Sequence, residues 1–368
     1  MKTVTVMVTG VGGGGHGEQI FKALRLSDMH YRIVAADMAP QSKALFLADK
    51  AYLLPRANHP HYLESLLDIC RQEDVKALFH GSEPELRVFA ENRKRIEAQG
   101  LFLPINTTEV IRRCMNKGAT CAFLRDHGFA YPQFLTLRRV EDTIGFSKFP
   151  AVIKPSLGSG GSADAFIIQN KEELDFYARA MLSFHDECIL QEYVGTHQDE
   201  YTVGVLTDMD GGLLHSIAVK RSILSALSNR MKIPNRTGRA DLGPVLALSS
   251  GISQGEIGPF PEVTRQCEDI ALALGSRGPL NIQCRLVGGT VYVFEINPRF
   301  SGTTSLRAMA GFNEPDLLVR RHVLGQPVQP GFPYARGIIT RGLDEFFFRQ
   351  TDERCIDESF LPKGGNDA

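Results

Sequence analysis

The sequence lacks three features that would each indicate a particular kind of protein: paired cysteines, an excess of one charge and a long apolar run. Its seven cysteines are scattered and never have CxxC spacing, which argues against a disulfide framework or a zinc site and predicts reduced thiols in a cytoplasmic protein. A net charge of −1 gives no electrostatic reason to expect nucleic acid or an anionic membrane as a partner. No apolar run is long enough for a transmembrane helix, and the one at the N-terminus predicts a strand, not a signal peptide.

What the sequence does contain is an alternation of strands and helices over residues 1–108. A strand at 3–9, a glycine loop at 10–17, a helix at 18–27 and a strand at 31–37 begin the series. Such alternation is typical of an open, parallel α/β sheet. We therefore predict a Rossmann-like N-terminal domain.

The glycine loop matches the dinucleotide-binding fingerprint. Gly10, Gly12 and Gly15 have the G-x-G-x-x-G spacing, and Asp37 ends the next strand. Two interpretations stay open: an NAD site, or a tight turn that packs the strand closely against the helix. We favour the turn, or a role in substrate binding, because the motifs further along the chain indicate a different nucleotide site.

The most informative motif is a polar pair at the end of a hairpin. Side chains alternate along a strand, so Glu295 and Asn297 point the same way, and a turn at 288–289 folds Gln283 back beside them. Carboxylate and amide oxygens suit Mg²⁺ that also carries phosphate oxygens. Arg299 follows at once, a planar cation suited to a phosphoryl group. The alternative is a hairpin that merely has a polar end.

A second glycine cluster follows a strand that carries Lys154. Backbone N–H groups of such a loop can hold phosphates, and the lysine adds positive charge. The alternative is a mobile surface hairpin. The cluster consists of Gly158, Ser159, Gly160, Gly161 and Ser162.

A strand end and a following glutamate could recognise a nucleoside. The backbone of Glu192, Tyr193 and Val194 can read an adenine edge, and the Glu200 carboxylate can accept ribose hydroxyls. Taken alone, either glutamate is better explained as part of a solvated face.

Two charged clusters are ambiguous. The basic stretch 220–239 predicts a loop, which either covers an acidic ligand or is merely solvated. Glu83 and Glu85 follow a strand of the first domain, and we interpret them as the acidic start of a helix over 83–98.

Together these elements, with Lys117 after a linker helix, resemble the ATP-grasp superfamily over roughly residues 3–325. The amino-acid sequence of residues 280–324 is most similar to one synthetase half of the carbamoyl-phosphate synthase large subunit. This chain has one such unit, not two in tandem. The resemblance implies a two-lobed α+β ATP-grasp fold after the Rossmann-like (pre-ATP-grasp) domain.

The resemblance also implies ATP and Mg²⁺ as cofactors, with Mn²⁺ as an alternative metal. It implies that Lys117 and Lys154 contact the ATP phosphates and that Arg299 steadies the transferred phosphoryl group. It implies that Glu192 and Val194 contact the adenine and that Glu200 binds the ribose. The metal ligands that it implies are Gln283, Glu295 and Asn297.

We expect four segments: the N-terminal domain at 1–108, a linker helix and lid subdomain at 109–194, a catalytic subdomain at 195–330, and an extension at 331–368 with a disordered end.

The expected function is an ATP-dependent ligase that activates a carboxylate as an acyl phosphate and joins it to an amine. Its partners would be small-molecule carboxylates and amines, and a homodimer is one expected assembly. The alternatives are a bicarbonate-activating, carbamoyl-phosphate-type enzyme, an NAD-dependent dehydrogenase and a non-catalytic ATP sensor.

Overall fold

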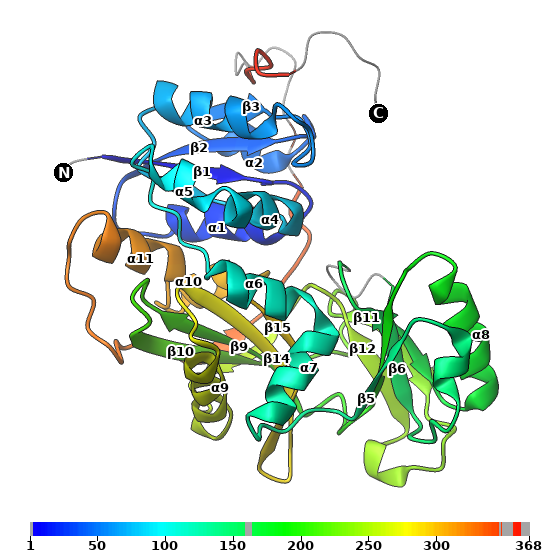
Figure 1. Cartoon of the computed structure of the whole chain (residues 1–368). Coiled ribbons are helices and arrows are strands. Elements are labelled where there is room, and N and C mark those ends of the chain that lie inside the picture. Colours follow the sequence, from blue (N-terminus) through cyan, green and yellow to red (C-terminus); the bar gives the residue numbers. More distant parts are fainter. Residues whose placement is uncertain (1–2, 159–163, 346, 348–355, 362–368) are drawn as a thin grey trace.

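Figure 1 shows a computed structural model of the chain, which describes residues 3–158, 164–345, 347 and 356–361. A parallel sheet with its helices forms the N-terminal part, a large antiparallel sheet lies below it, and a smaller antiparallel sheet lies beside the large one. The expected fold class, a Rossmann-like parallel sheet followed by a two-lobed α+β unit, is confirmed.

The N-terminal sheet is parallel, with the strand order β3-β2-β1-β4. Alternate residues of β1 enter different cores: Val6 and Val8 pack into one, and Met7 into the other. Helices on both faces are therefore needed to bury the strand. The elements are β1 (Val4–Thr9), α1 (His16–Arg25), β2 (Tyr31–Asp37), α2 (Lys43–Leu47), β3 (Lys50–Leu53), α3 (Tyr62–Gln72), β4 (Ala77–Phe79), α4 (Glu83–Glu91) and α5 (Arg93–Glu97).

The large sheet is antiparallel, with the order β15-β14-β9-β10-β13-β16. One face packs against α9, and the other shares a hydrophobic core with the N-terminal sheet, in which Val6 and Phe312 both lie. Its elements are β9 (Glu200–Thr207), β10 (Leu213–Arg221), β13 (Gly255–Gly258), α9 (Pro261–Leu274), β14 (Pro279–Val287), β15 (Thr290–Asn297), α10 (Thr304–Met309), α11 (Glu314–His322) and β16 (Gly337–Ile339).

The small sheet has the order β5-β8-β6-β7, and a two-stranded hairpin, β11-β12, packs beside β7. Two helices lead into it from the N-terminal sheet (Figure 1). The elements of this part are α6 (Thr108–Met115), α7 (Lys117–Asp126), β5 (Phe134–Leu137), β6 (Ala151–Pro155), β7 (Phe166–Ile168), α8 (Lys171–Leu182), β8 (Cys188–Glu192), β11 (Asn229–Pro234) and β12 (Val245–Ser249).

Two local expectations were wrong. The basic stretch 220–239 is not one loop, because it contains the end of β10 and all of β11. Alternating exposure along β11 shows why: its apolar residues pack inward while its basic residues face outward. The helix expected over 83–98 is divided at Asn92, which ends α4 and precedes α5.

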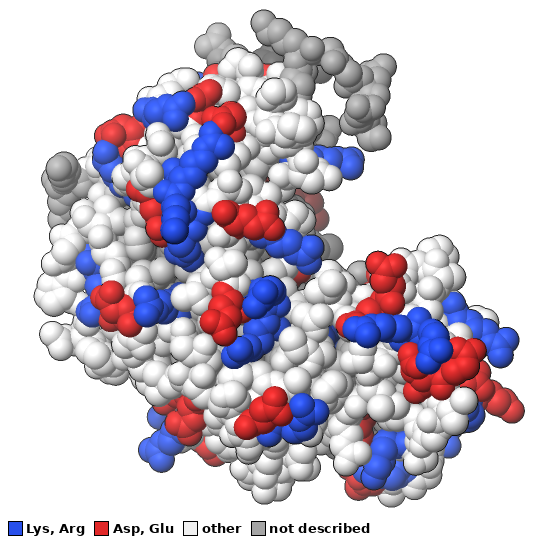
Figure 2. Space-filling view, viewed as in Figure 1, with Lys and Arg blue, Asp and Glu red and all other residues white. Residues whose placement is uncertain are grey.

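Figure 2 shows that the surface is hollowed between the N-terminal part and the small sheet. Basic and acidic side chains are interspersed over this face, in keeping with a net charge of −1. The six cysteines within the described ranges are free and buried. No helix formed by the described residues is both long and apolar enough to cross a membrane.

Candidate active site

The hairpin β14–β15 brings the three proposed metal ligands together. Gln283 and Glu295 lie directly opposite each other. The turn at Gly288 and Gly289 alone would pair Gln283 with Phe294, and a register shift between Gln283 and Cys284 places Glu295 there instead. Gln283 Nε2 donates to Glu295 Oε2 at 2.7 Å. Asn297, two residues further along β15, is buried, and its Oδ1 accepts a hydrogen bond from the Arg299 guanidinium at 3.1 Å.

This donor set fits Mg²⁺. It offers one carboxylate and two amide oxygens, all hard donors, and its single negative charge leaves room for anionic phosphate oxygens around the ion. Within the described ranges there is no cluster of three or more His, Cys, Asp or Glu side chains that could hold a metal ion in another way. Gln283, Glu295 and Asn297 offer oxygen donors that could hold Mg²⁺.

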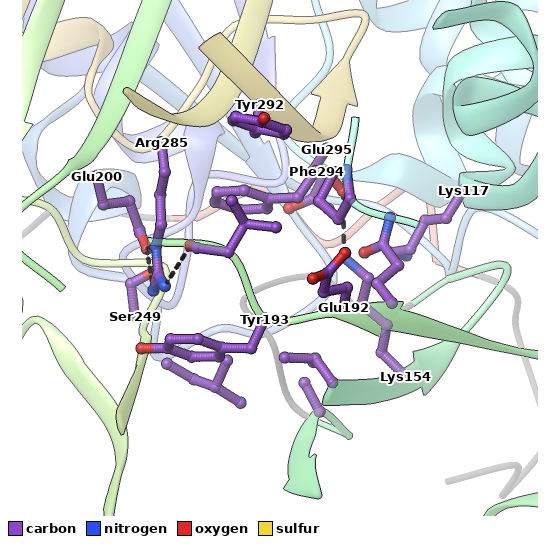
Figure 3. Close-up of a pocket in the computed structure, with 16 residues that line it drawn as sticks. Lys117, Lys154, Glu192, Tyr193, Glu200, Ser249, Arg285, Tyr292, Phe294 and Glu295 are labelled. Carbon is purple, nitrogen blue, oxygen red and sulfur yellow. Dashed lines mark hydrogen bonds and ion pairs between the residues drawn. The ribbon is translucent and has the colours of Figure 1, made fainter. Parts of the chain in front are cut away.

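A cleft of about 730 Å³ adjoins Glu295. Figure 3 shows Lys117 and Lys154 at one end of this nucleotide-sized cleft and Glu200 and Arg285 at the other. Apolar side chains form its walls, which suits a flat aromatic base. The lining residues are Lys117, Pro132, Val152, Lys154, Ala165, Gln191, Glu192, Tyr193, Val194, Glu200, Leu248, Ser249, Arg285, Tyr292, Phe294 and Glu295.

The two lysines reach the cleft from different elements. Lys154, near the end of β6, is buried and donates to the Phe294 carbonyl at 3.2 Å. Burial lowers the pKa of Lys154 to about 8, although the nearby Glu295 carboxylate acts in the opposite direction. Lys117 begins α7, and its backbone N–H donates to the Ser156 carbonyl at 3.0 Å, which ties this helix to the chain just after β6.

Glu200 is placed at the cleft, but its carboxylate is already engaged. Arg285 on β14 and Arg221 on β10, the two strands that flank β9, donate to its two oxygens at 3.1 to 3.3 Å. All three side chains are buried. The expected role of Glu200 in binding ribose would therefore require it to share these arginine contacts.

Sequence reasoning missed Arg285. Its N–H groups donate to Glu200, to the carbonyls of Val194 and Gly195 and to that of Ala247, at 3.1 to 3.3 Å. Its guanidinium also lies 4.3 Å from the centre of the Tyr193 ring. Arg285 thus fixes the connector after β8. The sequence did contain a signal for Arg285, because residues 283 and 285 point to the same face of one strand. Arg285 therefore lies on the face that carries the proposed metal ligand Gln283.

The connector itself is rigidly held. The Tyr193 hydroxyl donates to the Ala247 carbonyl at 3.0 Å and accepts from the Ala247 N–H at 2.9 Å. The Glu192 N–H donates to the Gln133 carbonyl, and the Tyr193 N–H to that of Pro150. The backbone around Val194 consequently faces the cleft in a defined position.

Arg299, which lies just after the end of β15, links the large sheet to the N-terminal part. Its guanidinium donates to the Glu83 carboxylate at 2.8 Å. Burial opposes ionisation of Glu83, but Arg299 outweighs it and holds the pKa of this carboxyl below its usual range. We interpreted both glutamates as the start of a helix, and this holds for Glu85, which accepts a hydrogen bond from the Gly81 N–H. For Glu83 the interpretation was incomplete, because this residue also pairs with Arg299.

The two glycine loops differ. Of the second cluster, Gly158 lines a neighbouring cavity, whereas Ser159, Gly160, Gly161 and Ser162 lie outside the described residues. In the first loop, the Gly12 N–H donates to Asp37 at 2.7 Å, and a Cβ at Gly12 would stand 2.3 Å from the Ser42 hydroxyl. These contacts support a packing role for the first glycine loop. They also engage Asp37, the acidic residue of the dinucleotide fingerprint, in a hydrogen bond within the protein.

Two family models match parts of the chain. One, described as "PylC-like, N-terminal domain", matches residues 6–103; the other, "ATP-grasp in the biosynthetic pathway with Ter operon", matches residues 249–341. Among curated proteins, the carbamoyl phosphate synthase large chain of Haemophilus ducreyi is 24% identical over 325 residues. That match covers 84% of this chain but only 28% of the relative, so the chain spans less than a third of that protein.

Solved structures share the fold over most of the chain. The L-amino acid ligase from Bacillus licheniformis gives a TM-score of 0.60 at 17% identity, covering 90% of this chain and 78% of that one. N5-carboxyaminoimidazole synthetase from Staphylococcus aureus, complexed with ADP, gives 0.58 at 14% identity, covering 91% and 79%. The chain is thus similar to ATP-grasp proteins: residues 249–341 match an ATP-grasp family model, and the solved structures share its fold.

Proposed function

We propose that the chain is an ATP-dependent ligase that phosphorylates a carboxylate and transfers the resulting acyl group to an amine, releasing ADP and phosphate. The observation that supports this most strongly is the meeting of Lys117, Lys154, Glu295, Asn297 and Arg299 around adjoining cavities. These residues come from α7, from β6 and from the end of β15 or just after it, and the fold brings these three elements together. Among the similar structures are ligases, one of them complexed with ADP.

The chemistry follows from charge. Transfer of a phosphoryl group needs positioning and neutralisation of negative charge, not a protein nucleophile. Lys117 and Lys154 hold phosphate oxygens of ATP at one end of the cleft, and Arg299 holds the group in transfer. Gln283, Glu295 and Asn297 would hold Mg²⁺, which when bound supplies further charge neutralisation.

The acid reacts in two steps. Its carboxylate oxygen attacks the γ-phosphorus, and ADP leaves. The amine then attacks the carbonyl carbon, the bond from that carbon to the phosphate-bound oxygen breaks, and phosphate leaves with this oxygen. The apolar side chains that line the cleft limit access of water, which would otherwise hydrolyse the acyl phosphate.

A bicarbonate-activating enzyme of the carbamoyl-phosphate type is the second candidate. It is favoured by the curated relative, a carbamoyl phosphate synthase large chain, and it would use the same residues. Bicarbonate as the sole acid in the assay separates the two. The proposal further includes Mg²⁺ or Mn²⁺ as the metal, small-molecule substrates, a homodimer, a cytoplasmic location and the domain boundaries given above.

The test is Glu295→Gln, which keeps the shape of the side chain but removes its charge. Turnover is measured as ADP release, with hydroxylamine present to trap acyl phosphates as hydroxamates. We expect a loss of about 10²–10³ in rate, typical for one electrostatic group at a reacting centre. The matched control is Glu109→Gln, which removes the charge of an exposed ion pair on α6 and should leave turnover unchanged. Near-normal turnover of a folded Glu295→Gln protein would contradict the proposal.

A further inference from the structure

A second cavity, of about 530 Å³, adjoins the proposed metal ligands Gln283, Glu295 and Asn297. Glu295 lines both the nucleotide-sized cleft and this cavity. In the part of the chain that the structure describes, every side chain that lines it is polar or absent. The lining residues are Thr202, Arg221, Ser250, Gly251, Ser253, Asn281, Gln283, Glu295, Asn297, Arg299, Ser301, Gly302 and Thr303.

Several of these groups have unused hydrogen-bonding capacity. Arg221 is buried, and its two terminal nitrogens donate to Glu200, Ser249 and the carbonyls of Ser250 and Ile252. Its Nε has no acceptor among the described residues. The Ser253 hydroxyl, on a residue only 4% exposed, likewise has no hydrogen bond within the described ranges. Arg221 Nε is enclosed by protein, so the Ser253 hydroxyl is the group that a polar ligand would satisfy and an apolar ligand would leave unpaired.

The charges of the cavity are largely balanced. Arg221 is paired with Glu200, and Arg299 with Glu83. Glu295 adds one negative charge at the side where the metal would lie. Because Arg285 also pairs with Glu200, the positive charges of Arg221, Arg285 and Arg299 are balanced only when Glu295 is counted with Glu200 and Glu83. These described groups therefore carry no net positive charge that would attract a second anionic group. The cavity favours a ligand with one carboxylate and neutral polar substituents.

We propose that this cavity binds the acid substrate and selects a small hydrophilic one, with a hydroxyl or amide group in addition to the reacting carboxylate. This inference rests on the proposed ligase function. Its position beside Gln283, Glu295, Asn297 and Arg299 places the acid next to the residues assigned to the phosphoryl group. The other polar side chains that line the cavity distinguish a hydrophilic acid from an apolar one.

The experiment compares isosteric acids that differ only in polarity. L-asparagine is paired with L-leucine and L-threonine with L-valine; succinamate with 4-methylpentanoate and 3-hydroxybutyrate with 3-methylbutanoate repeat these pairs without the amino group. ADP release and hydroxamate formation are measured with Mg·ATP and hydroxylamine. The hydrophilic member of at least one pair should have a kcat/KM at least about 10-fold above that of its partner, because a site built for hydrogen bonds rejects an analogue that lacks them.

Two variants test directly whether the polar side chains of the cavity select the acid. Ser253→Ala and Thr303→Val each remove one hydroxyl from the cavity with little change of volume. Either should lower kcat/KM for the preferred hydrophilic acid about 3- to 10-fold and leave the value for its apolar isostere within about 2-fold, so discrimination shrinks. A merely structural role would lower both values equally. The rise in melting temperature with Mg·ADP checks that each variant is folded.

The outcomes separate the two proposals. Equal or better turnover of the apolar acids, with ADP and hydroxamate formed, would overturn the selectivity while leaving the ligase function intact. If the ratio of kcat/KM between hydrophilic and apolar acids is unchanged in both variants, the proposed selectivity is likewise overturned and the ligase function is left intact. No ADP release with any acid of the panel or with bicarbonate would contradict both.

Discussion

The Arg299 guanidinium donates to the Glu83 carboxylate at 2.8 Å, although the two residues are 216 positions apart in the chain. Arg299 follows the strand that carries Glu295 and Asn297, whereas Glu83 begins α4 of the N-terminal part. Both side chains are largely shielded from solvent. The N-terminal part thus contributes directly to the position of a group that we assign to the transferred phosphoryl.

Glu83→Gln should lower the rate of ADP release about 10-fold, because the amide still accepts a hydrogen bond but no longer balances the arginine charge. Mg·ADP affinity, measured by calorimetry, should stay the same. The control is again Glu109→Gln, in an exposed ion pair. An unchanged rate in the Glu83 variant would show that this contact has no part in catalysis.

Arg285→Met should lower the free energy of unfolding by about 3–5 kcal/mol, because it removes one of the two arginines that balance the buried Glu200 carboxylate. It should also weaken Mg·ADP binding, since the Val194 and Gly195 carbonyls lose their donor. Urea unfolding and calorimetry measure the two effects. Arg265→Met, exposed on α9, is the matched control and should change stability by less than about 0.5 kcal/mol. Equal effects of the two variants would contradict the role given to Arg285.

The pH dependence of kcat/KM for Mg·ATP should report Lys154. Burial lowers its pKa to about 8, so the side chain is a cation below that pH and becomes neutral as the pH rises through it. The value of kcat/KM should therefore fall above about pH 8, since this parameter reflects the free enzyme. In Lys154→Arg the fall should disappear up to about pH 10, because a guanidinium stays charged. An identical descending limb in both proteins would assign it to another group.

NAD and NADP should leave the melting temperature unchanged, whereas Mg·ATP at 100 times its dissociation constant should stabilise the protein by about 2.7 kcal/mol. The reason is that Asp37 is already bonded to the Gly12 and Ala39 N–H groups. Thermal unfolding with each nucleotide measures this. An NAD-induced rise that is lost in Asp37→Ala would restore the dehydrogenase interpretation.

Strand alternation made much of the site predictable. A two-residue turn sets the pairing of β14 with β15 as far as Cys284, and Glu295 and Asn297 share a face because they are two residues apart, but Gln283 meets Glu295 only through a register shift that the turn does not predict. The alternation of strands and helices over the N-terminal part likewise follows from period and turn residues. Such features depend on near neighbours in the chain.

Contacts between distant segments were not predictable in this way. Nothing in the sequence around Glu200 indicates that Arg221 and Arg285 lie on its two neighbouring strands, because the order of strands in a sheet is a tertiary property. The same holds for the pairing of Glu83 with Arg299. The basic residues of β11 concealed a strand because their number outweighed the weak alternation of Met231 and Ile233.

The most direct test of the central proposal is the fate of the carboxylate oxygen. The acid that forms hydroxamate fastest is labelled with ¹⁸O in both carboxylate oxygens, and the phosphate released in a single turnover is analysed by mass spectrometry. An acyl phosphate intermediate requires that one labelled oxygen from each acid molecule appears in inorganic phosphate. Label in AMP, or unlabelled phosphate together with product, would contradict the proposed mechanism.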